Sequence, residues 1–313
     1  MNSIRLGCSS LSGSRLAYGC WRLAGSEGEV PPADVATTGI RAVHAALDAG
    51  FTLFDLADIY GGGESERIFG RALAESPGIR DRIVVASKCG IRKSGEPRPD
   101  SPYRYDFSAR HIVASVEGSL RRMGIGHLDV LMLHRPDVLM DPAEVAGAFL
   151  QLRDAGKVRE FGVSNFRPSQ VTALQHAVPF PLAVHQFEAS LHQLMALEDG
   201  TLDHCISTDI RAMAWSPLDK GRLGSLPPAS GGTADTDARR SLRAVLDGIA
   251  ADHDVSRPVM ALAWLLRHPA RMIPVIGTTR PERIRELARA ESVQIERDPW
   301  YRLLEAARGS RLP

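Results

Sequence analysis

Several features that would define a special class of protein are scarce or missing in this sequence. The 313 residues include four cysteines, at positions 8, 20, 89 and 205, and none of them forms a Cys-x-x-Cys pair. We therefore expect neither a disulfide framework nor a structural zinc site, and a reducing, cytoplasmic environment is the simpler interpretation. No run approaches the roughly 18 apolar residues of a membrane span, and the first 15 residues lack the apolar core of a secretion signal.

The charge is balanced, because 38 basic and 37 acidic residues leave a formal net charge of +1. Such a chain has no strong positive field, so we do not expect a nucleic-acid partner. Hydrophobic residues make up 44% of the chain and charged residues 24%, as in ordinary globular proteins. The sequence has no repeat at the periods of solenoids or propellers and no linker that would divide it. We therefore expect a single domain over residues 1–313.

The order of the apolar patterns predicts the fold. Short apolar runs alternate with longer amphipathic segments, and each run ends at a turn residue or a polar residue. This pattern is typical of strands that are buried on both faces of a parallel sheet and are separated by helices. Eight such pairs predict an α/β fold of the (β/α)8 TIM barrel type. The expected strands are residues 15–18, 51–54, 83–87, 129–133, 160–163, 182–185, 210–214 and 273–276.

Local signals mark the helices and the remaining segments. Ser108 is a suitable N-cap for a helix over 109–123, and Pro142, Pro168 and Pro281 stand where further helices begin. The alternation also predicts helices over residues 33–49 and 64–73. Residues 3–14 predict an N-terminal hairpin that closes the bottom of the barrel. Residues 91–107 and 224–237 predict long loops on the C-terminal face, where barrel enzymes have their active sites.

Polar side chains stand at the ends of three successive expected strands. Asp55, Lys88 and His134 follow the second, third and fourth strands, and Tyr60 lies five residues after Asp55. Because the ends of barrel strands converge on one rim, we expect these four side chains to meet. Each alone has an ordinary explanation, as a helix cap, a lysine that reaches water or a structural histidine. Three strands that end in this way favour a functional site.

The four residue types suit proton transfer to a carbonyl group. A phenol has a pKa near ~10, and a nearby ammonium group lowers it by stabilising the phenolate. Lys88 supplies that charge, and Asp55 keeps Lys88 charged and oriented. His134 is suited to hydrogen-bond a substrate oxygen. The predicted site can therefore protonate a carbonyl oxygen while hydride arrives at the carbon.

Four separated motifs then point to a known family. They are residues 50–70 (GFTLFDLADIYGGGESERIFG), 87–90 (SKCG), 133–137 (LHRPD) and 156–166 (GKVREFGVSNF). In this order they make the chain similar to the aldo-keto reductase superfamily, and in particular to its bacterial oxidoreductase branch. The resemblance covers essentially the whole chain. It implies hydride transfer from NADPH to an aldehyde or ketone, with Tyr60 as the general acid assisted by Lys88, Asp55 and His134.

The resemblance also implies a cofactor site, in which NADPH lies extended across the C-terminal face without a Rossmann fold. One group of residues matches the nicotinamide site, a second matches the loop along the pyrophosphate, and a third matches the adenosine end. Arg283 of the third group matches the arginine that meets the 2′-phosphate, and a guanidinium suits a phosphate. The three groups are Ser164, Asn165, Gln186 and Trp215; Ser216, Leu218, Lys220 and Gly221; and Gly277, Thr278, Thr279, Arg283 and Glu286.

Two departures from the family pattern concern the choice of cofactor. Gly277 stands where many members have lysine, and Leu287 stands where asparagine is common. NADH is therefore a possible cofactor beside NADPH.

Two further residues are candidates for the substrate pocket. Trp21 either walls that pocket or covers the barrel, and Arg135 either binds a polar or anionic substrate or forms a surface salt bridge.

Alternative functions remain open at this level. Lys88 at a strand end also permits a Schiff base of the aldolase type. A sugar or alcohol dehydrogenase working in the oxidative direction, or a non-catalytic NADPH-binding regulatory protein, would have the same fold. The expected partner is a small carbonyl or alcohol substrate, with no nucleic acid, no membrane and no metal. We expect a monomer or a small homo-oligomer.

Overall fold

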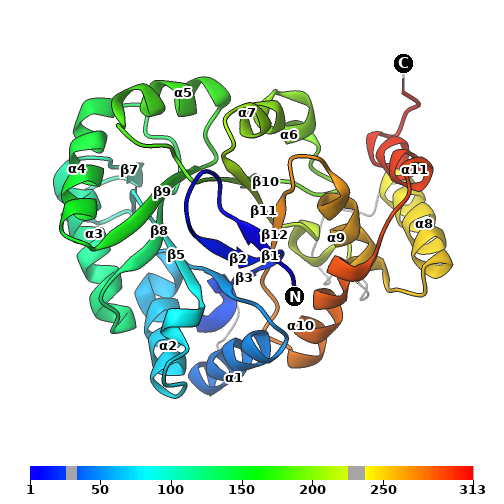
Figure 1. The fold of residues 1–313 in the computed structure, drawn as a ribbon, viewed down its shortest axis with the longest axis horizontal. Helices are drawn as coiled ribbons and strands as arrows, with labels where there is room; N and C mark the ends of the chain where they lie inside the picture. The colour runs from blue at the N-terminus through cyan, green and yellow to red at the C-terminus, as the bar shows by residue number, and fades with distance from the viewer. Residues whose placement is uncertain (26–33, 225–236, 313) are drawn as a thin grey trace.

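The computed structural model describes residues 1–25, 34–224 and 237–312. Eight parallel strands form a closed barrel that is surrounded by helices (Figure 1). The strands pair in chain order, and the last pairs with the first, so the predicted (β/α)8 TIM barrel is confirmed. The barrel strands are β3 (Ala17–Gly19), β4 (Leu53–Asp55), β5 (Val84–Cys89), β8 (Leu128–Leu133), β9 (Val158–Ser164), β10 (Val184–Glu188), β11 (Arg211–Trp215) and β12 (Ile273–Ile276).

Two strands continue two or more residues further than the apolar pattern predicts. β5 ends two residues later than expected and β10 ends three residues later. Lys88 and Gln186 therefore lie inside strands, where they pair with Met132 and Met213 of the neighbouring strands. Backbone partners on both sides extend a central strand past the point where its side chains become polar.

The helices begin where the local signals predict. Ser108 Oγ accepts a hydrogen bond from the backbone N–H of His111 and so caps its helix. Three helices begin at the predicted prolines. The helices are α1 (Val35–Asp48), α2 (Glu64–Ala74), α3 (Ala109–Met123), α4 (Pro142–Asp154), α5 (Pro168–Ala177), α6 (Met195–Glu198), α7 (Thr201–Ser207), α8 (Asp237–Asp252), α9 (Arg257–Arg267), α10 (Pro281–Ala288) and α11 (Arg297–Arg308).

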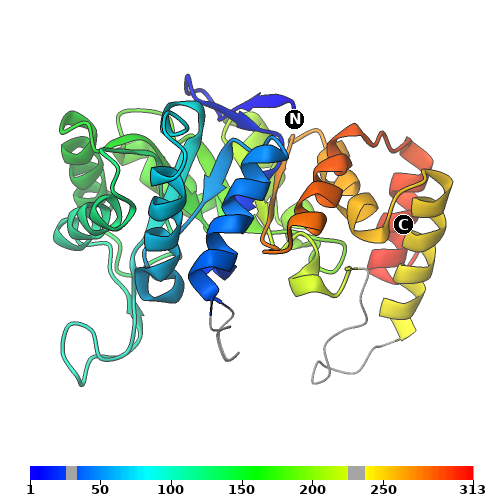
Figure 2. The ribbon, with the colours of Figure 1, turned by 90° about the horizontal axis from the view of Figure 1, so that it is seen from below.

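The N-terminal hairpin closes one end of the barrel, as predicted. Strands β1 (Ser3–Arg5) and β2 (Ser12–Ser14) are antiparallel. Ile4, Leu6 and Leu11 are buried in one apolar cluster with side chains from the barrel interior. Figure 2 shows the hairpin at one end of the barrel and the connection over residues 91–107 at the other. The hairpin thereby leaves the C-terminal ends of the strands as the accessible rim.

The long connection over residues 91–107 contains a small sheet of its own. Strands β6 (Ile91–Arg92) and β7 (Arg104–Tyr105) are antiparallel, and an ion pair of 3.0 Å joins Arg92 to Asp106. In Figure 2 this connection extends from the end of the barrel opposite the hairpin. Most of the second predicted loop, residues 225–236, lies outside the described residues, as does residue 33 of the first expected helix.

Candidate active site

The barrel brings together the four polar residues predicted at its rim. Asp55 is the last residue of β4, Lys88 lies in β5 and His134 directly follows β8. Tyr60 begins the short helix η2 (Tyr60–Gly63) in the connection after β4. The side chains of Lys88 and Asp55 are 0% and 4% exposed, so their charges are almost fully removed from water.

Lys88 is the centre of this group. Its Nζ lies 2.7 Å from Asp55 Oδ1, and it donates to the carbonyl of Leu56 at 2.8 Å and to the hydroxyl of Tyr60 at 3.2 Å. An ammonium group has three donors, and here all three have a partner. Burial lowers the pKa of Lys88, but Asp55 and Tyr60 outweigh it and raise that pKa above its ordinary value. An amine with a pKa raised in this way carries a proton at neutral pH.

Tyr60 keeps its proton at neutral pH. Burial raises its pKa above the ordinary value, Lys88 opposes that effect, and Asp55 adds to the increase. The lowering by Lys88 that the sequence predicts is thus present, but burial outweighs it because the phenolate would be poorly solvated.

The turn after Tyr60 requires glycine, because Gly61, Gly62 and Gly63 have φ values of 57°, 64° and 90°.

His134 faces Tyr60 and is neutral. The two rings are 5.9 Å apart between centroids and meet edge to face. Burial, with the charges of Lys88 and Arg135, lowers the pKa of His134 well below its ordinary value. Its Nδ1 is buried and has no hydrogen-bond partner among the described residues. A neutral imidazole has one donor and one acceptor, so this ring has hydrogen-bonding capacity that the neighbouring side chains do not use.

Hydrogen bonds link the predicted nicotinamide residues to this group. Gln186 Nε2 donates to Asp55 Oδ1 at 2.9 Å. Asn165, with a left-handed φ of 62°, donates from Nδ2 to the carbonyl of His134 at 3.1 Å and to Ser164 Oγ at 2.8 Å. Its Oδ1 accepts a hydrogen bond of 2.9 Å from Trp215 Nε1. The structure thus places these residues beside the tetrad of Asp55, Tyr60, Lys88 and His134.

The two predicted substrate residues lie on the same rim. The guanidinium of Arg135 is 5.5 Å from the centre of a Trp215 ring. In the part of the chain that the structure describes, Arg135 forms no ion pair within 4.0 Å, although burial raises the pKa of the half-buried Glu188 and the charge of Arg135 opposes that increase. Trp21, in the short helix η1 (Trp21–Ala24), is 39% exposed, and the guanidinium of Arg22 lies 5.0 Å from its ring centre.

The predicted pyrophosphate residues form a tight turn after β11. Ser216, Asp219 and Lys220 have φ values of 49°, 44° and 54°, which non-glycine residues rarely adopt. Leu218 packs against the apolar core, whereas Lys220 and Gly221 are exposed in the short helix η4 (Asp219–Gly221). The turn therefore exposes Lys220 and Gly221, and its left-handed backbone persists only where surrounding contacts stabilise it.

The predicted adenosine residues follow β12 and enter α10. Arg22 Nη1 donates to the carbonyl of Gly277 at 3.2 Å, and the hydroxyl of Tyr18 donates to the carbonyl of Thr278 at 3.1 Å. Thr279 is partly exposed beside them. Arg283 and Glu286 lie in α10, near its start and near its end. Within the described ranges Arg283 forms no ion pair.

The sequence did not reveal several contacts in this region. Among them are the bond from Arg22 to Gly277, the bond from Lys88 to Leu56 and a hydrogen bond of 2.7 Å between His192 Nδ1 and Asp219 Oδ2. Each joins residues on different connections or uses a backbone carbonyl. Apolar periodicity and spacing carry no signal for such contacts.

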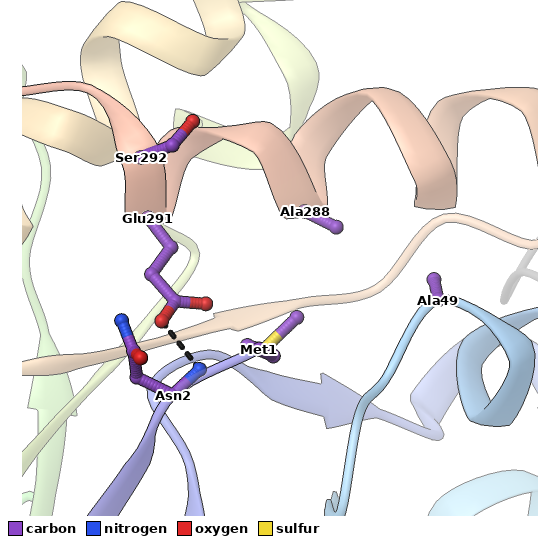
Figure 3. A pocket seen from close by; sticks show the side chains of 6 residues that line it. All are labelled: Met1, Asn2, Ala49, Ala288, Glu291 and Ser292. Atoms are coloured by element: carbon purple, nitrogen blue, oxygen red, sulfur yellow. Dashed lines mark hydrogen bonds between the residues drawn. The ribbon is translucent and has the colours of Figure 1, made fainter.

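A surface pocket lies near the start of the chain, away from the tetrad. Figure 3 shows it, with Glu291 accepting a hydrogen bond of 2.5 Å from the backbone N–H of Asn2. The pocket is lined by Met1, Asn2, Ala49, Ala288, Glu291 and Ser292.

The described residues contain no group of three or more histidine, cysteine or acidic side chains that could hold a metal. None of their helices is long and apolar enough to cross a membrane.

Comparisons with known proteins agree with this geometry. The chain is 41% identical over 315 residues to a 6-dehydroglucose reductase of Novosphingobium aromaticivorans, which covers 99% of this chain and 96% of the relative. It is 40% identical over 303 residues to the oxidoreductase YdhF of Escherichia coli, with 96% and 95% covered. A glycerol dehydrogenase structure from Gluconobacter oxydans superposes with a TM-score of 0.84 at 27% identity, over 99% of this chain and 97% of that one. The model of the aldo/keto reductase family matches residues 15–308, so the chain belongs to the aldo/keto reductase family and is an oxidoreductase.

Proposed function

We propose that this oxidoreductase reduces an aldehyde or ketone with NADPH, and that Tyr60 donates the proton. The observation that carries the proposal is the position of Lys88 Nζ, which contacts the Asp55 carboxylate and the Tyr60 hydroxyl at once. As the phenol gives up its proton, negative charge develops on an oxygen that already accepts a hydrogen bond from a cation. Stabilisation that grows as the reaction proceeds is what accelerates it.

Each member of the tetrad has a role in this proposal. Tyr60 holds the proton until the carbonyl oxygen gains electron density, because burial keeps its pKa above the ordinary value. Asp55 keeps Lys88 protonated and is itself held by Gln186. His134 positions the substrate oxygen. Its neutral ring has an N–H donor for that oxygen and adds no second positive charge beside Lys88. A protonated Lys88 argues against the Schiff-base alternative, because a nucleophilic amine must first lose its proton.

The residues on the rim fit a phosphorylated nicotinamide dinucleotide. Members of the aldo/keto reductase family generally use nicotinamide cofactors, and such a cofactor supplies the hydride. The fit rests on the cations of Lys220 and Arg283 and on the unpartnered Nδ1 of His134. We assign the nicotinamide to the network around Asn165 and the 2′-phosphate to Arg283. Because Gly277 provides no lysine side chain to bind the 2′-phosphate, we propose NADH as a weaker second cofactor.

The substrate is proposed to be a small polar carbonyl compound. Arg135 adds a cation to the rim close to His134, and a cation favours hydroxylated or anionic substrates. The names of two similar proteins refer to such compounds: one is a 6-dehydroglucose reductase and the other a glycerol dehydrogenase. The same site catalyses alcohol oxidation when NADP⁺ and alcohol are supplied, so a polyol substrate remains the second candidate.

The first test is a tryptophan-fluorescence titration with NADPH and, separately, with NADH. We expect saturable quenching of Trp215 with both and tighter binding of NADPH. Equal affinity would assign the protein dual cofactor use, whereas no binding of either would contradict the proposal. Turnover is then measured with a panel of aldehydes, ketones and hydroxylated carbonyl compounds.

Tyr60→Phe tests the role of the proton donor in the same assays. We expect it to bind NADPH with unchanged affinity and to lose at least 100-fold in kcat, the usual contribution of a general acid. Tyr105→Phe, on β7, is the matched control that removes a phenol elsewhere and keeps activity. A Tyr60→Phe enzyme with wild-type turnover would refute the assignment.

A further inference from the structure

The imidazole of His192 is tied to the turn that follows β11. His192 lies in the connection between β10 and α6, and its Nδ1 is 2.7 Å from Asp219 Oδ2. Both side chains are 12% exposed, so water competes little with this contact. Asp219 Oδ1 accepts a second hydrogen bond, of 3.1 Å, from Arg222 Nη1. The carboxylate is therefore held from two sides, and the hydrogen bond from His192 and the charge of Arg222 lower the pKa of Asp219.

The position of His192 is itself well defined. Ser190 and Gln193 exchange backbone hydrogen bonds of 3.2 Å and 3.0 Å, and the backbone N–H of His192 donates to Ser190 Oγ at 3.1 Å. His192 is thus carried by a closed turn that directly follows β10. It can serve as a fixed point for the neighbouring connection.

The turn that Asp219 belongs to needs such support. Three of its non-glycine residues, Ser216, Asp219 and Lys220, have left-handed backbone conformations. Each costs free energy and persists only where contacts specify it. Asp219 has the only carboxylate in residues 216–221 and joins this segment to the β10 connection. Its neighbour Lys220 carries one of the cations on which the proposed fit of the dinucleotide rests, and the family resemblance matches it to the loop along the pyrophosphate.

We propose that His192 is a positioning residue for the bound dinucleotide. By holding Asp219, it fixes residues 216–221 in the conformation that receives the pyrophosphate. The inference rests on the proposed function, because it assumes that a nicotinamide dinucleotide lies along this turn. His192 touches none of the reacting atoms, so it acts on cofactor binding and not on the chemical step.

The test compares His192→Ala with His192→Asn and His192→Gln. The asparagine amide occupies the place of Nδ1 and keeps a donor for Asp219, whereas the glutamine amide lies at the place of Nε2. We expect His192→Ala and His192→Gln to weaken NADPH binding about tenfold and NADH binding by the same factor, because both share the pyrophosphate. His192→Asn should restore most of the affinity, and kcat at saturating cofactor should stay within about twofold in all three.

A control and a double variant separate this role from general damage. His127→Ala removes the other described histidine that pairs with an aspartate near a barrel strand, at the N-terminal end of β8. It should leave cofactor affinity unchanged. His192→Ala and Asp219→Ala should both weaken cofactor binding, Asp219→Ala by at least as much because it also removes the contact with Arg222. The double variant should lose no more than Asp219→Ala alone.

The outcomes distinguish this inference from the proposed function. A wild-type protein that binds neither cofactor overturns both. Wild-type binding with unchanged affinity in His192→Ala and His192→Gln overturns the inference alone. So do additive losses in the double variant, or a loss in His192→Asn as large as in His192→Ala.

Discussion

The indole Nε1 of Trp215 donates a hydrogen bond of 2.9 Å to Oδ1 of Asn165, across the end of β10. Trp215 ends β11 and Asn165 follows β9, so the bond joins two strands that are not neighbours in the barrel. Because Asn165 also donates to the carbonyl of His134, the three residues form one connected chain. The Trp215 ring, which belongs to the group proposed for the nicotinamide, is therefore oriented through Asn165, which also contacts the backbone of His134.

Trp215→Phe removes this bond and keeps an aromatic ring. The loss leaves the partly buried Asn165 oxygen without its donor, which costs about 0.5–1.5 kcal/mol of stability. We expect weaker NADPH binding together with that loss, measured by urea unfolding and cofactor titration. Trp21→Phe, at an exposed position on the same rim, is the control and should change stability little. Wild-type stability and affinity in Trp215→Phe would show that the bond does not orient the site.

Lys88→Met separates the structural and chemical parts of the buried ion pair. It leaves the Asp55 carboxylate almost fully buried without its cation, and breaking such a pair costs about 3–5 kcal/mol. We expect a large fall in the urea midpoint and no measurable turnover. Adding Asp55→Asn should recover much of the stability, because the unpaired charge is gone, but none of the activity. Recovery of activity in the double variant would contradict the role given to Lys88.

The sequence predicted the fold because its signals are local. Ser108, Pro142, Pro168 and Pro281 start helices as expected, and all eight apolar runs correspond to barrel strands. The meeting of the four tetrad residues followed from one general rule, that the ends of barrel strands share a rim. Their roles in catalysis stay predictions.

Contacts between connections could not be predicted in the same way. The bonds from Trp215 to Asn165 and from His192 to Asp219 depend on left-handed backbone at Asn165 and Asp219. Such conformations at non-glycine residues result from tertiary contacts, so the residue types alone do not indicate them. The raised pKa of Tyr60 was missed for a similar reason, because the balance between desolvation and the Lys88 charge depends on the three-dimensional surroundings.

Arg283→Ala tests the proposed contact with the 2′-phosphate. Loss of a charged hydrogen bond costs about 1.5–3 kcal/mol, so NADPH binding should weaken by at least tenfold. NADH lacks that phosphate and should bind as before. Arg285→Ala, which removes an exposed arginine from the same helix, is the matched control. Fluorescence titration with both cofactors measures the effect, and equal losses for NADPH and NADH would refute the assignment.

Asp58→Asn should change how stability depends on pH. Asp58 lies two residues before Tyr60, and its Oδ1 is buried with no hydrogen-bond partner among the described residues. Burial, with the nearby charge of Glu66, raises the pKa of Asp58 to about 7, although a hydrogen bond with Ser115 and the charge of Arg122 oppose the change. The folded chain therefore keeps a proton that the unfolded chain loses near pH ~4.

The sign of the effect follows from proton binding. Between about pH 4 and 7 the folded state holds more protons than the unfolded state, so the free energy of unfolding falls as the pH rises, by at most about 1.4 kcal/mol per pH unit. Asparagine cannot ionise, so Asp58→Asn removes this dependence and should be more stable than the wild type above pH 7. Urea unfolding between pH 4 and 8 measures it, with Asp252→Asn at an exposed position as the control. Parallel stability profiles for the wild type and Asp58→Asn would mean that Asp58 is ionised in the folded protein.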